Sequence, residues 1–179
     1  MAIRSIRGSI SIGRTLLPEF GQEMANTRKT LERHPDRKFD RMPGEKSGSM
    51  GRLAGRVANM TEWAVETIDK GGFDMAPGGV QMQPPWRLKA RKDLLDSFEK
   101  QWPRPPVTPR GERCAGAEAM PWSFMTNVQV LFSMPHIGCL RTWVMNHRRP
   151  HHAQLRLYLR LNNLPIPAIY LPSTDEGQK

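Results

Sequence analysis

The sequence predicts a mainly α-helical protein, with a small helical core and long extended Pro/Gly-rich and basic arms ordered by a large partner assembly. Three observations predict this class. Hydrophobic residues make up only 38% of the 179 residues, which allows one modest core. The chain has 16 Pro and 15 Gly, above the usual combined share of about 12%. Lys and Arg outnumber Asp and Glu by 27 to 17, giving a net charge of +10, which is typical of proteins that bind polyanions.

The first predicted segment is a basic N-terminal arm at residues 1–17. It carries Arg4, Arg7 and Arg14 among hydroxyl side chains and has no acid. This is the composition of an organellar targeting segment, and it lacks the continuous apolar run of a secretory signal. We expect either a targeting arm that is not removed or a basic arm that lies on the partner.

Residues 18–102 form the predicted helical region, with helices over 18–33, 49–70 and about 86–101. Each of the three shows apolar residues at helical spacing. Pro35 ends the first helix, and a Gly-Gly pair follows the second. The longest apolar stripe belongs to the second helix and consists of Met50, Leu53, Val57, Met60, Ala64 and Ile68.

Cations crowd the first two turns of the third predicted helix, where they oppose the helix dipole. Two explanations are open: a bound anion attracts them, or they form a solvated face whose charge Asp93 and Asp96 offset. The cations are Arg87, Lys89, Arg91 and Lys92.

Residues 103–121 form a proline-rich strap, predicted to be a rigid arm on a surface. A C-terminal helical or mixed region with a basic patch follows at 122–164. Within it, the alternation around Val130 admits a strand, and a short helix over 122–134 is equally compatible. Helix propensity favours a helix for 151–164 over the strand suggested by alternating leucines. The remaining residues, 165–179, form an extended tail because proline recurs there.

The basic patch lies in an acid-free stretch, residues 141–174. Arginine contacts phosphates in a fork geometry, and aromatic rings can stack on bases. No known RNA-binding module is visible, which favours binding to the shape and phosphates of folded RNA. Anionic lipid headgroups or an acidic protein subunit could meet the same side chains. The candidate arginines are Arg141, Arg148, Arg149, Arg156 and Arg160, and the stacking candidates are Trp143 and Tyr158.

No motif indicates catalysis, so we expect a protein that is not an enzyme and uses no cofactor. Gly44–Gly48 contains a Lys-Ser pair but lacks the spacing of a phosphate-binding loop. We expect no metal site, because Cys139, His147, His151 and His152 match no zinc signature. Cys114 and Cys139 are expected to be free thiols in a reducing compartment.

These observations predict a non-catalytic structural subunit of a large organellar assembly. The leading hypothesis is a mitochondrial ribosomal protein that binds rRNA phosphates and neighbouring proteins, in the matrix or at the matrix face of the inner membrane. The alternative is an accessory subunit of an inner-membrane respiratory complex or ATP synthase, in contact with membrane subunits and anionic lipids. The uncharged stretch 119–140 supports the alternative, although its polar residues and prolines argue against a membrane span.

Overall fold

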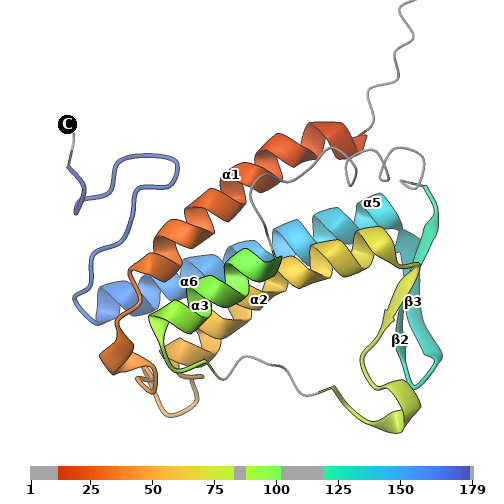
Figure 1. Ribbon diagram of the computed structural model, residues 1–179, viewed down its shortest axis with the longest axis horizontal. Helices are drawn as coiled ribbons and strands as arrows, with labels where there is room; N and C mark the ends of the chain where they lie inside the picture. Colours follow the sequence, from red (N-terminus) through yellow and green to blue (C-terminus); the bar gives the residue numbers. More distant parts are fainter. Residues whose placement is uncertain (1–11, 83–87, 102–118, 178–179) are drawn as a thin grey trace, which may run out of the picture.

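Four helical elements lie side by side, and a small sheet sits at one end of them (Figure 1). The computed structural model describes residues 12–82, 88–101 and 119–177. The first three helices are α1 (Ile12–Glu32), α2 (Met50–Asp69) and α3 (Arg91–Gln101). The fourth element is continuous and consists of α5 (His136–Cys139), the π-helical segment η3 (Leu140–Asn146) and α6 (His147–Leu161).

Helix α2 begins and ends where its sequence predicts. The Ser49 side chain accepts a hydrogen bond from the Arg52 backbone N–H at 3.2 Å, which caps the first turn. In the same turn, Gly51 donates its N–H to the Phe39 carbonyl at 2.8 Å. A Cβ at Gly51 would lie 2.4 Å from the Phe39 ring, so only glycine allows this approach. The 3₁₀ segment η1 (Asp36–Lys38) leads into this contact.

Three strands form the sheet in the order β1-β2-β3. Strand β1 pairs in parallel with β2, and β2 pairs antiparallel with β3, with a register shift between Phe124 and Met125. The short 3₁₀ segment η2 (Pro77–Gly79) follows β1. The strands are β1 (Gly72–Asp74), β2 (Pro121–Thr126) and β3 (Gln129–Pro135).

The hydrophobic core lies between the helices. Every helical element contributes fully buried aliphatic side chains to one cluster, which extends to aromatic residues such as Phe98 and Tyr158. Side chains with no exposed surface include Leu31 of α1, Val57 of α2, Leu94 of α3, and Leu155 and Leu159 of α6. The described elements therefore bury their apolar faces against one another within the chain.

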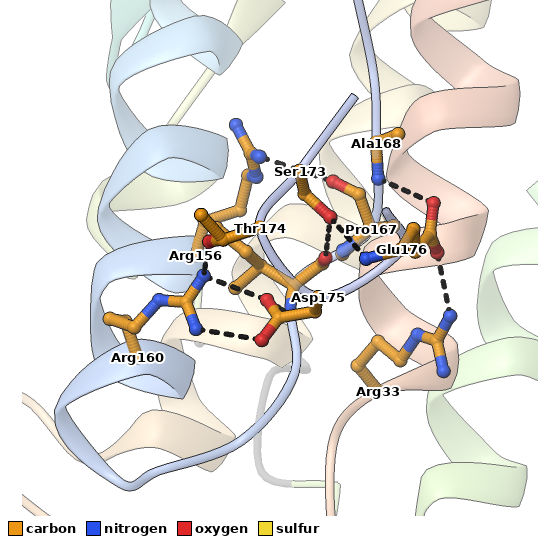
Figure 2. Close-up of polar contacts among 10 residues, drawn as sticks. Arg33, Arg156, Arg160, Pro167, Ala168, Ser173, Thr174, Asp175 and Glu176 are labelled. Atoms are coloured by element: carbon orange, nitrogen blue, oxygen red, sulfur yellow. Dashed lines mark hydrogen bonds and ion pairs between the residues drawn. The ribbon is translucent and has the colours of Figure 1, made fainter. Parts of the chain in front are cut away.

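The predicted fold class is wrong. The fold is α/β, and the described residues show no long extended arm that needs a partner assembly to order it. Residues 122–134, left open between strand and helix, form most of β2 and β3. The extended tail 165–177 packs back on α1 and α6 (Figure 2). Its acids pair with Arg160 of α6 and with Arg33, the residue that follows α1, and the sequence of the tail alone does not reveal these pairs.

The helix predictions are confirmed, with shifted ends. The helix expected over 18–33 begins six residues earlier, so Pro18 lies inside α1. The helix favoured for 151–164 is α6, which begins at His147. Most of the expected N-terminal arm and of the proline-rich strap lie outside the described residues. No helix within the described ranges is long and apolar enough to cross a membrane.

The turn between β2 and β3 places a valine in the left-handed region. Asn127 and Val128 have φ of 48° and 60°, as a two-residue hairpin turn requires. Asparagine tolerates this conformation, whereas a β-branched residue is strained in it. The Asp74 carboxylate accepts the N–H groups of Asn127 and Val128 at 2.9 and 2.8 Å. These bonds lower the pKa of Asp74 and hold the turn.

Val128→Gly should therefore stabilise the protein by about 1 kcal/mol, because glycine adopts positive φ without strain. The matched control is Val130→Gly in the adjoining strand, which should lower the free energy of unfolding. Urea unfolding of the two variants and the wild type measures both effects. Destabilisation by Val128→Gly equal to that by Val130→Gly would contradict the strain argument.

Two buried histidines should make the fold sensitive to acid. His34 has no exposed surface and packs 4.1 Å from the Phe39 ring, and His152 is 6% exposed. Burial lowers the pKa of each imidazole to about 4. In the unfolded chain each would titrate near its ordinary value of about 6.5. Unfolding therefore takes up protons below pH 6.5, and stability falls as the pH drops from 6.5 towards 4.

The free energy of unfolding should be lower at pH 4.5 than at pH 7.5 by about 2 kcal/mol for each of the two imidazoles. Urea titrations at a series of pH values measure this difference. His34→Leu should flatten the profile, whatever it does to stability at pH 7.5. If the free energy of unfolding fell with pH as steeply in His34→Leu as in the wild type, His34 would not contribute to the acid sensitivity.

Candidate functional site

Two histidines and an arginine meet between α2 and the start of α6. His147 and His151 lie one turn apart on α6, with their Nε2 atoms 3.1 Å apart. Arg56 of α2 brings Nη2 to within 3.3 Å of His147 Nε2. All three side chains are partly exposed, so the cluster is open to solvent. We call Arg56, His147 and His151 the His–Arg cluster.

The helical repeat of α6 positions this cluster. Residues four apart share a helix face, so His147 and His151 point together towards α2. Arg148 and His152 each follow one of them and form a second pair with the same spacing. That pair faces α1, where Arg148 donates to the Thr27 hydroxyl and His152 lies 2.7 Å from the Thr30 hydroxyl.

Aromatic rings border the cluster on one side. The Trp63 and Trp143 rings each lie 5.9 Å from the His147 ring. Trp143 stacks in turn on Phe124 and Phe132 of the sheet, at 5.9 and 5.2 Å. An apolar cleft adjoins the two tryptophans, and its walls also include Glu66, Thr67, Phe73, Trp122, Phe124 and Cys139.

The electrostatics of the cluster favour a fixed cation beside neutral imidazoles. Burial lowers the pKa of His147 and His151, and the Arg56 charge lowers both further. A neutral imidazole has one acceptor nitrogen. At His147 that acceptor is Nε2, and both Arg56 and His151 direct nitrogens at it. The histidines therefore orient the guanidinium without neutralising it.

Comparison with known proteins shows the fold. No protein-family model matches the chain, and no curated protein matches it. Among solved structures, it is similar to the crystal structure of a DinB-like protein from Bacillus cereus ATCC 10987, determined at 2.01 Å resolution. The TM-score is 0.62 at 19% sequence identity, and the match covers 88% of this chain and 97% of that one.

The predicted function is wrong. A fold shared with a bacterial DinB-like protein gives no support to a mitochondrial ribosomal protein or to a subunit of a respiratory complex or ATP synthase. The expected mitochondrial location is corrected with it, because it depended on membership of those assemblies. The prediction failed because it treated the arginines as free, whereas the fold pairs several of them internally.

The structure does not bring the predicted anion-binding residues together on one free surface. Arg4, Arg7 and Arg87 lie outside the described residues, and only the helical backbone of Arg14 is described. Tyr158 is buried in the core, and Trp143 lies in the aromatic stack. The exposed members are Lys89, Arg91, Lys92 and Arg141, together with Arg149 and Arg160.

Arg148 is a core residue. Its side chain is 4% exposed, contacts Met24 Sδ at 2.9 Å and donates to the Thr27 hydroxyl. Burial lowers the pKa of its guanidinium to about 9. The group therefore stays charged at neutral pH but cannot reach an external phosphate.

The other C-terminal arginines have partners elsewhere in the chain. Arg149 pairs with Glu19 of α1 at 2.6 Å. Arg156 donates to the Pro167 carbonyl at 3.1 Å, and Arg160 holds both oxygens of Asp175 at 3.0 and 2.7 Å (Figure 2). The acid-free stretch is thus compensated by one residue of α1 and by the tail just beyond it.

The cations at the start of α3 also have a partner within the chain. The Asp36 carboxylate accepts the Arg91 backbone N–H at 2.6 Å and supplies negative charge at the helix N-terminus. Lys92 pairs with Asp96 one turn later. An external anion is not needed to explain why the cations lie there.

The sequence did not identify Arg56 as a candidate site residue. The helix predicted over 49–70 was distinguished by its apolar stripe, so none of its arginines was a candidate site residue. The available signal was the pair His147 and His151, whose spacing of four aims two imidazoles at one point. The facing residue belongs to a helix about 90 positions away in the chain, which no local pattern identifies.

Arg148 and Arg149 should respond differently to truncation. Arg148→Ala empties a buried site and should destabilise the protein by about 2–4 kcal/mol. Arg149→Ala removes an exposed ion pair and should cost less than about 1 kcal/mol. Arg148→Met should cost less than Arg148→Ala, since it keeps packing volume and removes a buried charge. Equal effects of the two alanine variants in urea unfolding would contradict the burial argument.

Proposed function

We propose that this protein is a non-catalytic binding protein for a small molecule that carries an anionic group and an apolar part. The carrying observation is the convergence of Arg56, His147 and His151 at 3.1–3.3 Å beside the aromatic cleft. Binding sites of this kind combine mainly apolar walls with a few convergent polar groups. The fold similarity is compatible with this proposal but does not supply it.

The polar end of the ligand would meet Arg56. A guanidinium binds carboxylate or phosphate through two parallel N–H bonds, which are about twice as strong as bonds between neutral groups. In the free protein, one of its nitrogens donates to the neutral His147 ring. Replacing that neutral acceptor by an anion strengthens the bond, and the His151 Nε2–H, which faces the same acceptor in the free protein, can contribute a further donor.

The apolar end of the ligand would pack on the partly exposed Trp63 and Trp143 rings, because the cleft beside them has a volume of only about 20 Å³, which is room for about one water. Trp63 and Trp143 border both the cleft and the His–Arg cluster. The two tryptophan rings replace water on one side of the cluster, which strengthens the interaction between Arg56 and an anion. This arrangement favours an aryl or branched alkyl carboxylate over a small hydrophilic anion.

Cys139 supports binding without covalent chemistry. Its thiol lines the cleft and is 1% exposed. Burial raises its pKa, although a contact with the Thr67 hydroxyl works in the opposite direction. Because the thiolate is the nucleophilic form of cysteine, a thiol with a raised pKa is poorly suited to attack a substrate.

Phenylacetate and acetate test the proposal as matched probes. Phenylacetate should bind the full chain in isothermal titration calorimetry and shift the imidazole resonances of His147 and His151, and acetate should bind more weakly. Arg56→Gln should weaken phenylacetate binding about 10–100-fold, the value of a charge-assisted bond. Arg52→Gln, one turn earlier and exposed, should change it little. No binding by either probe, or equal losses in the two variants, would contradict the proposal.

A further inference from the structure

We infer that the guanidinium of Arg56 occupies the position that a metal ion would take beside His147 and His151. The His–Arg cluster therefore carries a permanent cation in place of a metal centre. The inference concerns metal binding alone and does not depend on whether phenylacetate is a ligand. It follows from the geometry of the two histidines and from the chemistry of the third side chain.

The histidine pair has the spacing of two ligands of one metal ion. Protein nitrogens bind zinc at about 2.0–2.1 Å, so two nitrogens on one tetrahedral ion lie roughly 3.3 Å apart. The Nε2 atoms of His147 and His151 are 3.1 Å apart. The repeat of one helix orients both rings, so in the tautomer that carries its proton on Nδ1 each imidazole presents an Nε2 lone pair on the same side of α6.

The third side chain makes this position unsuitable for a metal ion. Arginine has five N–H donors, no acceptor, and a charge that it does not lose in proteins. Its Nη2 lies 3.3 Å from His147 Nε2 and so points at the lone pair that a metal would use. Among the described residues, no three His, Cys, Asp or Glu side chains lie close enough together to hold an ion.

A guanidinium in place of a metal ion changes the chemistry that the cluster can support. A guanidinium offers positive charge and N–H donors, as a metal-bound cluster would offer charge to an anion. It has no empty orbital to accept a lone pair, so it cannot lower the pKa of a bound water as zinc does. The cluster can therefore hold an anion at any metal concentration but cannot generate a metal hydroxide.

A single substitution at position 56 tests the inference. An imidazole is shorter than an arginine side chain, so Arg56→His would leave room for an ion between its nitrogen and the α6 histidines. Titration of the full chain with Zn²⁺ by calorimetry should show one site at least 100-fold tighter in Arg56→His than in the wild type. Co²⁺ should give a new visible absorption band in this variant only.

Two controls identify the ligands. Arg52→His adds an imidazole to an exposed position on the same helix and should leave Zn²⁺ affinity at the wild-type level. Adding His151→Ala to Arg56→His should abolish most of the gain, because one of three nitrogen ligands is lost. A gain that survives His151→Ala would show that the ion binds elsewhere, and the inference would be wrong.

The Zn²⁺ affinity of the wild type can also contradict the inference. Zn²⁺ binding by the wild type as tight as that by Arg56→His would show that the guanidinium does not occupy the metal position. If Arg56→His fails to fold, Arg56→Gln serves instead, because it removes the charge and leaves the two histidines. Arg56→Gln should then bind Zn²⁺ about tenfold more tightly than the wild type, and unchanged affinity would overturn the inference.

Discussion

The rotation of α6 about its axis depends on a buried polar contact with α1. Arg148 and His152 reach across to the hydroxyls of Thr27 and Thr30. A buried guanidinium or imidazole without a partner costs several kcal/mol, so α6 is restricted to the rotation that satisfies both. The same rotation fixes the direction of the residue that precedes each of these two side chains in the sequence. His147 and His151 consequently face α2, and the His–Arg cluster is positioned by a contact on the other side of the helix.

The C-terminal tail packs against the same two helices, α1 and α6. Asp175 holds Arg160 of α6, and Glu176 holds Arg33 at the end of α1 (Figure 2). Exposed pairs of this kind are each worth little in water. The main effect of these pairs is therefore to position the tail along the two helices, so that Leu164 and Ile166 pack against the core. In a chain with a net charge of +10, such pairing also removes local repulsion between neighbouring arginines.

Local patterns were sufficient for the helices and insufficient for the contacts between distant segments. The stripe of α2, with the Gly-Gly pair after it, located that helix almost to the residue. Strand β1 was missed because it is three residues long and begins within the Gly71-Gly72 pair, and because its partner β2 lies about 50 residues away. The basic patch failed for the same reason. Counting acids within the stretch 141–174 could not reveal Glu19, which is 130 positions distant from Arg149.

Arg148 in the core and Arg56 in the His–Arg cluster carry the same charged group, but they differ in burial and therefore in role. Arg148 extends from α6 to α1 and Arg56 extends from α2 to His147 of α6, but Arg148 is 4% exposed whereas Arg56 stays partly exposed. Full burial makes the charge of Arg148 a constraint on folding, since no external group can reach it. Partial exposure leaves the charge of Arg56 open to solvent beside the two imidazoles. Under the proposed function, this guanidinium would bind and orient the anionic group of a ligand through its N–H donors, a role that a Lewis acid would fill in a metal site.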